Sequence, residues 1–130
     1  MEFKKVSSEI DRIAKEVVDS VFCVHKALGP GLLESVYEAC MLHELKKRGM
    51  KVESQKAMQI VYDELKIDTG LRLDLLVEDE IIVELKAVEA ILPVHDSQIL
   101  SYLKLANKRL GLLINFNVPV IKDGIRRKIL

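Results

Sequence analysis

The first part of the chain has a helical pattern of apolar positions. Apolar side chains recur every three or four residues from Ile10 to Leu28, which is the period of one face of an α-helix. Ser7 or Ser8 can cap the start of this helix. We expect the helix to run to about residue 27, where a Gly-Pro-Gly sequence ends it.

A second helix is predicted over residues 32–48, with Gly49 as its C-terminal cap. Glu34 lies in its first turn, where an acid complements the helix dipole. The alternative is that Glu34 points towards the strands that follow. The expected buried stripe of this helix consists of Leu33, Val36, Tyr37, Cys40, Met41 and Leu45.

The middle of the chain does not follow the helical period. Residues 51–62 predict a strand, either continuous or broken near Gln55, with a turn at Asp63-Glu64. Two further apolar runs lie within residues 71–87, joined by an acidic turn. We therefore expect three consecutive antiparallel strands.

A third helix and a further strand complete the pattern. The helix begins at Val94 or Asp96, and Gln98 and Tyr102 share one of its faces because they are four residues apart. The apolar run at residues 110–116 predicts a buried strand, paired in parallel by a right-handed crossover. The tail after it carries a basic cluster and can add a last strand. The element order predicts an α/β sandwich, with a mixed sheet flanked by helices.

Three charged side chains interrupt the apolar runs of the central hairpin: Asp74, Glu84 and Lys86. Glu84 and Lys86 share one face of their strand because side chains alternate. A three-residue loop over residues 78–80 places Asp74 opposite Glu84, whereas a two-residue loop places Asp74 opposite Val83. The two carboxylates meet only in the first register, or with a bulge that restores it.

Two explanations of these charges remain open on spacing alone. Asp74 can form an ordinary ion pair with Arg72 or Lys86 on a solvated face. Alternatively, Asp74 and Glu84 hold a hard divalent cation, which removes the repulsion between facing acids and is commonly bound by one or two carboxylates with water and phosphate. Lys86 would then hold a phosphate or a water.

Composition narrows the class of protein. A chain of 130 residues, nearly half of them apolar, is sufficient for one domain with its own core. Its 20 basic and 20 acidic residues give zero net charge, so any surface for nucleic acid must be local. Cys23 and Cys40 fall in apolar helical patterns and are expected to be buried free thiols. The sequence shows no signal peptide and no membrane span, and we expect a cytoplasmic protein.

Several segments together resemble the GxxExxY proteins, which are placed in the PD-(D/E)xK nuclease superfamily. The resemblance covers nearly the whole chain and rests on Gly29-Pro-Gly-Leu-Leu-Glu-Ser-Val-Tyr37, Arg72-Leu-Asp-Leu-Leu-Val77, Val83-Glu-Leu-Lys-Ala-Val88 and Leu112-Leu-Ile-Asn-Phe116. It implies a single restriction-endonuclease-like domain over residues 1–130. Leu73 stands where many members of the superfamily have proline, and that position varies among them.

The resemblance also implies a site. Asp74 corresponds to the metal-binding aspartate of the superfamily, and Glu84 and Lys86 correspond to its (D/E)-x-K pair. Glu34 matches the helix glutamate of several branches, and the segment from Gln98 to Tyr102 is similar to the Q-x-x-x-Y motif of RecB-like nucleases. The implied metal ligands are Glu34, Asp74, Glu84 and the Leu85 carbonyl, and the catalytic set is Lys86, Glu84, Asp74, Gln98 and Tyr102.

The function implied is a phosphodiesterase that hydrolyses DNA or RNA with Mg²⁺ or Mn²⁺. The alternative is a non-catalytic binding or assembly module that retains the fold, because a small chain with zero net charge has little surface for gripping a duplex. We expect a nucleic-acid partner. A homodimer or a partner protein can complete a groove that binds it.

Overall fold

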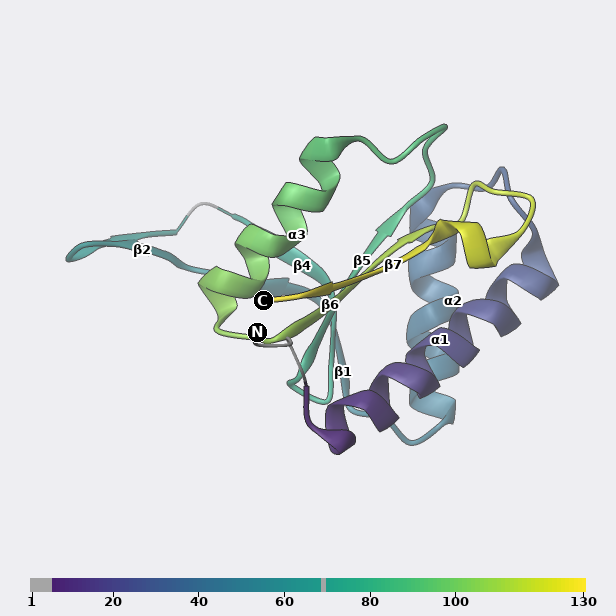
Figure 1. Ribbon diagram of the computed structural model, residues 1–130, viewed down its shortest axis with the longest axis horizontal. Helices are drawn as coiled ribbons and strands as arrows, with labels where there is room; N and C mark the ends of the chain where they lie inside the picture. The colour runs from purple at the N-terminus through teal and green to yellow at the C-terminus, as the bar shows by residue number, and fades with distance from the viewer. Residues whose placement is uncertain (1–5, 69) are drawn as a thin grey trace, which may run out of the picture.

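The computed structural model describes residues 6–68 and 70–130. Its helices and strands follow one another along the chain without any internal repeat of their order (Figure 1). In chain order they are α1 Ser8–Leu28, α2 Glu34–Lys47, β1 Val52–Ala57, β2 Ile60–Tyr62, β3 Leu65–Ile67, β4 Arg72–Val77, β5 Ile81–Lys86, α3 Pro93–Ala106, β6 Leu110–Asn115, the 3-10 helix η1 Ile121–Gly124, and β7 Ile125–Ile129.

Five of the strands form one mixed sheet in the order β1-β4-β5-β6-β7. Strand β4 is antiparallel to both of its neighbours, β1 and β5. Strand β6 is parallel to β5, and β7 is antiparallel to β6. The parallel pair follows the crossover through α3, as the sequence predicts. The predicted fold class, a mixed sheet flanked by helices in a restriction-endonuclease-like sandwich, is confirmed.

Helices cover both faces of the sheet, with α1 and α2 on one side and α3 on the other (Figure 1). One buried cluster joins α1 and α2 to the sheet through residues such as Val17, Met41 and Leu85. A second cluster joins α3 to the opposite face through residues such as Ile99 and Ile82. Alternation along β5 therefore turns Val83 and Leu85 to α1 and α2, and Ile82 to α3.

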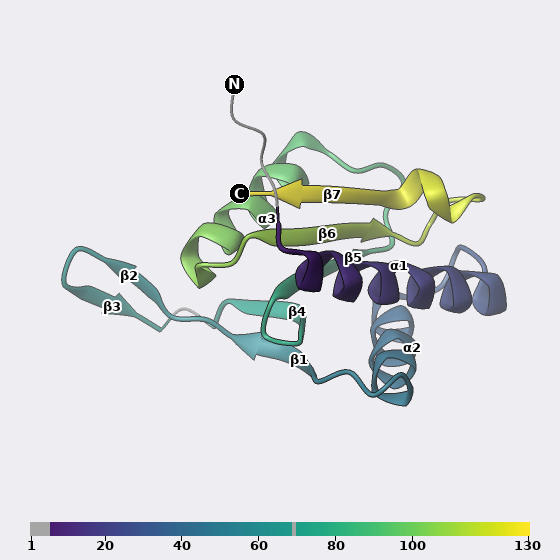
Figure 2. The ribbon, with the colours of Figure 1, turned by 60° about the horizontal axis from the view of Figure 1, so that its bottom comes forward.

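The segment between β1 and β4 differs from the prediction. Residues 51–62 were expected to form a strand, either continuous or broken near Gln55. The β1–β4 ladder is interrupted at Gln55, but β1 continues to Ala57 and the chain then forms a separate two-stranded hairpin, β2–β3. This hairpin extends away from the sandwich (Figure 2). Its register pairs Ile60 with Ile67 and Tyr62 with Leu65. The apolar residues of this segment indicate a strand, but they do not indicate whether it pairs within a local hairpin or within the main sheet.

The helix boundaries are close to those predicted, but two burial predictions are wrong. Helix α2 begins at Glu34, so Leu33 precedes it and is 73% exposed, and Val36 faces outwards. The buried stripe is narrower and consists of Tyr37, Met41 and Leu45.

The two cysteines also differ from the prediction of buried thiols. Cys23 is exposed and Cys40 is only partly buried. Cys23 lies just beside the buried positions of α1, and its sulfur contacts Nη2 of Arg48 at 3.4 Å. No helix in the described part of the chain is long and apolar enough to cross a membrane.

The basic cluster of the tail is held by ion pairs. Arg126 and Lys128 on β7 both contact Asp96 in the first turn of α3, at 2.7 and 2.8 Å, and Arg127 contacts Asp11 on α1 at 2.5 Å. Asp96 therefore ties the start of α3 to the far edge of the sheet. Three of the basic side chains of this cluster are therefore already paired within the chain.

The turn into β7 depends on a glycine with no room for a side chain. A Cβ at Gly124 would lie 2.1 Å from the backbone oxygen of Asn115. We expect Gly124→Ala to lower the free energy of unfolding by about 2–3 kcal/mol, because backbone atoms must move. Gly111→Ala is the control, because its Cβ would meet side-chain atoms of Ile99 and Leu103 and no backbone atom, at 2.8 Å from Cδ1 of Ile99. Chemical denaturation of both variants tests this, and an equal loss would contradict it.

Candidate active site

The sheet is interrupted at Asp74 on both of its sides. The β1–β4 ladder pairs Ser54 with Leu75 and Lys56 with Leu73, and it passes over Gln55 and Asp74 between them. The β4–β5 ladder pairs Val77 with Ile81 and continues to Leu75 with Val83, where it stops. The register is the one that the three-residue loop predicts, and the next position would place Asp74 opposite Glu84.

The interruption also changes which face of the sheet the β4 side chains occupy. In a regular strand, Leu73 and Leu75 would share a face. Leu75 instead packs with α1 and α2, and Leu73 packs with α3. The chain therefore twists at Asp74, which opens a gap between β4 and β5.

Side-chain carboxylates fill this gap and replace backbone acceptors. The N–H of Asp74 donates to Oε2 of Glu84 at 2.9 Å, and the N–H of Leu85 donates to Oδ2 of Asp74 at 2.8 Å. Each acid therefore accepts a hydrogen bond from the other acid's strand. Asp74 and Glu84 come together, as the sequence predicts for the three-residue register.

The structure does not contain the ion pair that offered an alternative explanation. Among the ion pairs of the described residues, none includes Asp74. Arg72 instead donates from Nη1 to the backbone oxygen of Gln55 at 3.1 Å.

Glu84 is a buried acid, with only 4% of the residue exposed. Burial, followed by the charge of Asp74, raises the pKa of its carboxyl to about 8, against the opposing effects of the Asp74 N–H and Lys86. Without a cation, Glu84 is therefore largely protonated at neutral pH. A proton shared between two close carboxyl groups is the ordinary response to their repulsion.

Lys86 and Glu34 complete the electrostatic surroundings. Partial burial raises the pKa of Glu34, the charge of Asp74 raises it further, and Lys86 lowers it. The Lys86 amine thus acts on both Glu34 and Glu84. Glu34 therefore lies within electrostatic reach of the acids of the β4–β5 hairpin. The side chain of Glu34 remains exposed, so a role as direct cation ligand stays a prediction.

Tyr37 holds the loop that presents Glu34. Its hydroxyl donates to the backbone oxygen of Gly29 at 2.6 Å and accepts from the N–H of Leu32 at 3.2 Å. Its ring stacks on Phe116 at 4.4 Å with an interplanar angle of 6°. These contacts fix the start of α2 against the sheet.

Helix α3 brings Tyr102 to the acids. Burial raises the pKa of the Tyr102 hydroxyl, and the charges of Glu84 and Asp74 raise it further. Gln98 lies one turn earlier on the same helix and is partly exposed. Contact of Gln98 with a substrate or water stays a prediction.

Two further polar residues belong to the same cluster and were missed in the sequence. Glu38 lies one turn after Glu34 on α2, and Nε2 of Gln55 donates to its Oε1 at 2.7 Å. The four-residue spacing of the two glutamates could have identified Glu38. The sequence indicated a possible break near Gln55 but no contact of its amide with the acids, because that contact depends on an unusual backbone conformation.

The oxygen donors of Asp74 and Glu84 fit a hard cation that takes few protein ligands. Within residues 6–68 and 70–130, no three His, Cys, Asp or Glu side chains are arranged to hold one metal ion. The close pair of oxygen donors, Asp74 and Glu84, is still sufficient for Mg²⁺, which usually keeps several waters and takes one or two protein carboxylates. These two acids and the Leu85 carbonyl are the groups that would hold it.

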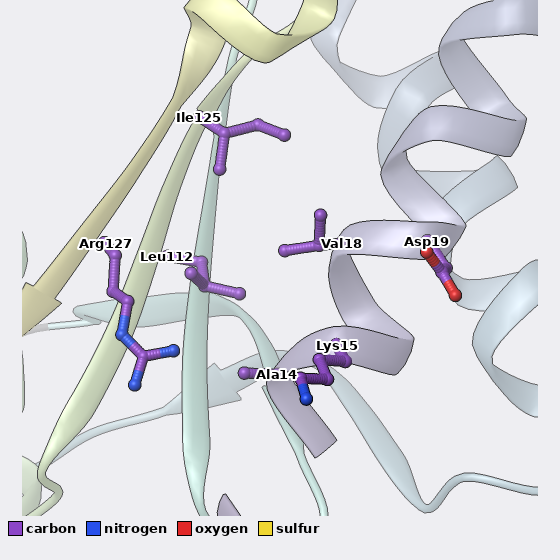
Figure 3. Close-up of a pocket in the computed structure, with 7 residues that line it drawn as sticks. All are labelled: Ala14, Lys15, Val18, Asp19, Leu112, Ile125 and Arg127. Carbon is purple, nitrogen blue, oxygen red and sulfur yellow. The ribbon is translucent and has the colours of Figure 1, made fainter. Parts of the chain in front are cut away.

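Two surface hollows lie away from Asp74, Glu84 and Glu34. One of about 270 Å³ lies between α1 and strands β6 and β7, and includes Lys15, Val18 and Leu112 (Figure 3). Another of about 310 Å³ lies between α1 and α2 and includes Cys23 and Cys40. Neither includes an acid of the cluster.

Comparison with known families agrees with this architecture. Residues 11–128 match the PD-(D/E)XK nuclease superfamily, and the chain belongs to that superfamily. No curated protein and no solved structure matches the chain. The family supports a nuclease-like function, and its members usually use divalent metals and bind nucleic acid.

The raised pKa of Glu84 predicts how stability depends on pH. The folded pKa of about 8 lies above the ordinary value of 4.5 for a glutamate, so the folded state binds the proton more tightly than the unfolded state. The stability of the cation-free protein should therefore fall as the pH rises between these values, by roughly 2–5 kcal/mol.

Glu84→Gln tests this expectation, because an amide resembles the protonated acid and cannot ionise. In EDTA, we expect wild type and variant to be similar at pH 5 and the variant to be more stable at pH 8. Urea denaturation at both pH values measures the difference. A stability difference that does not change with pH would contradict a buried, titrating Glu84.

Proposed function

We propose that the protein is a phosphodiesterase that depends on Mg²⁺ or Mn²⁺ and hydrolyses DNA or RNA. The observation that carries this proposal is the meeting of Asp74 and Glu84 in the sheet gap. Burying two like charges side by side is costly without a cation or a proton. A site that only stabilised the fold would be better served by an ordinary backbone ladder.

The residues around the gap have complementary roles in this reaction. Asp74, Glu84 and the Leu85 carbonyl would hold the cation, and Glu34 would join directly or through water. The cation would polarise the scissile phosphate and make water a better nucleophile. Lys86 orients or deprotonates the attacking water, or offsets the negative charge that develops on the phosphate.

Helix α3 would supply the remaining contacts. Tyr102 lies within electrostatic reach of Glu84 and Asp74, and Gln98, one turn earlier on the same face of the helix, would position water or phosphate with it.

We also propose that the chain belongs to the GxxExxY branch of the superfamily. The contacts of Tyr37 support this, because they link its hydroxyl to the Gly29–Leu32 loop and place Glu34 beside the hairpin acids. Gly31, the glycine of this spacing, lies in that loop with a φ of 93°, so the glycine, the glutamate and the tyrosine belong to one local arrangement.

The alternative function is a non-catalytic binding or assembly module. Two observations favour it: the carboxylates of Asp74 and Glu84 already accept backbone hydrogen bonds, and the basic side chains of β7 are held in ion pairs. Such a module would need a second copy or a partner protein to build a groove for nucleic acid.

Cleavage assays separate the two functions. Single- and double-stranded DNA and RNA are incubated with the full chain in Mg²⁺, Mn²⁺ or EDTA. We expect cleavage that needs the cation and falls at least about 100-fold in Glu84→Ala and Lys86→Ala. Glu80→Ala, in the exposed β4–β5 turn, is the matched control and should retain activity.

Cleavage that persists in EDTA or in both variants would contradict the proposed site. A correctly folded wild type that neither cleaves nor binds a cation in calorimetry would support the module.

Cation binding should also release a proton from Glu84, because the bound form requires the carboxylate. The affinity for Mn²⁺ should therefore rise with pH up to about 8, the pKa of Glu84. Titration calorimetry in two buffers of different ionisation enthalpy counts the released protons. Proton release that persists unchanged in Glu84→Gln would assign it to another group.

A further inference from the structure

Gln55 has a backbone conformation that its strand does not require. Its φ is 52°, in the left-handed region, which is unfavourable for residues other than glycine. The other non-glycine residues of the described chain with positive φ, Asp63, Glu78, Asp79 and Asn107, all lie at turns or at the end of a helix. Gln55 lies within β1, opposite Asp74, where the ladder is interrupted.

This conformation places the Gln55 amide between two acids from different elements. Its Nε2 donates to Oε1 of Glu38 on α2 at 2.7 Å and lies 3.5 Å from Oδ1 of Asp74 on β4. The second distance is at the outer limit for a hydrogen bond. Only the NH₂ end of the amide can serve carboxylates on both sides, so its orientation is determined.

The two oxygens of Asp74 therefore have different partners. Oδ2 accepts the N–H of Leu85 at 2.8 Å, and Oδ1 lies beside the Gln55 amide. The strong bond to Glu38 anchors the amide, and the weak contact leaves Oδ1 able to exchange its partner for a ligand. A neutral donor between Glu38 and Asp74 also reduces the repulsion between the acids.

We propose that Gln55 is a positioning residue of the site: anchored by Glu38, its amide holds Oδ1 of Asp74 in the orientation that receives the divalent cation. This inference rests on the proposed function and extends it to two residues outside the Asp74, Glu84 and Lys86 set. The strained backbone in mid-strand is the cost of that orientation, and such strain is concentrated at functional sites.

The test compares cation affinity with stability in three variants of the full chain. Gln55→Ala removes the amide, and Gln55→Asn retains an amide that is one methylene too short. Asparagine tolerates the left-handed region better than glutamine does. The matched control is Asp63→Ala in the β2–β3 turn, where φ is 56°, because it places alanine in the same backbone conformation away from the acids.

We expect both Gln55 variants to weaken Mn²⁺ binding in calorimetry by about 10-fold or more, as supporting residues of metal ligands do. Asp63→Ala should bind Mn²⁺ as wild type does. Gln55→Asn should also keep or raise the melting temperature in EDTA. A residue that served only the fold would make stability and affinity change together.

The outcomes distinguish this inference from the proposed function. If wild type binds Mn²⁺ and both Gln55 variants bind it equally well, the positioning role is wrong and the proposed function stands. If wild type neither binds Mn²⁺ nor cleaves, the proposed function is wrong. A double-mutant cycle of Gln55→Ala with Asp74→Asn, measured by denaturation in EDTA, then decides whether the amide acts on Asp74. If the two changes in the free energy of unfolding are additive, the coupling between Gln55 and Asp74 is wrong.

Discussion

The structure depends on one local exchange: two carboxylates take the place of backbone partners in the middle of a sheet. A buried strand normally satisfies its N–H groups through the ladder. At Asp74 and Leu85 the acceptors are instead Glu84 and Asp74 side chains. The exchange keeps the backbone satisfied and brings two carboxyl groups together where the β4–β5 ladder ends.

The surrounding elements are arranged to make this exchange tolerable. Apolar clusters on both faces of the sheet fix the positions of β4 and β5. Tyr37 fixes the start of α2, and Asp96 fixes the start of α3 through the basic residues of β7. Each helix can therefore bring a polar group to the gap without relying on the acids themselves for its position.

The same gap links stability to chemistry. A buried carboxyl with a pKa of about 8 is neutral in the cation-free protein at neutral pH, so the fold does not carry the full cost of two adjacent charges. Exchange of that proton for a divalent cation would leave both carboxyl groups ionised, with their charge neutralised by the cation. Gln55, whose amide lies between Glu38 and Asp74, supplies a neutral donor on the other side of Asp74.

The sequence by itself determined the order of the main elements, the α/β class and the parallel β5–β6 pair. These follow from period and alternation, which are local properties of the chain. Two registers of the β4–β5 hairpin remained open, and the structure selects the one that brings Asp74 to Glu84. It did not determine the separate β2–β3 hairpin, the exposure of Leu33 and Cys23, or the contacts of Glu38 and Gln55. Only tertiary structure decided these, because burial and a left-handed residue in mid-strand depend on which distant elements pack against the segment, and no local pattern records that.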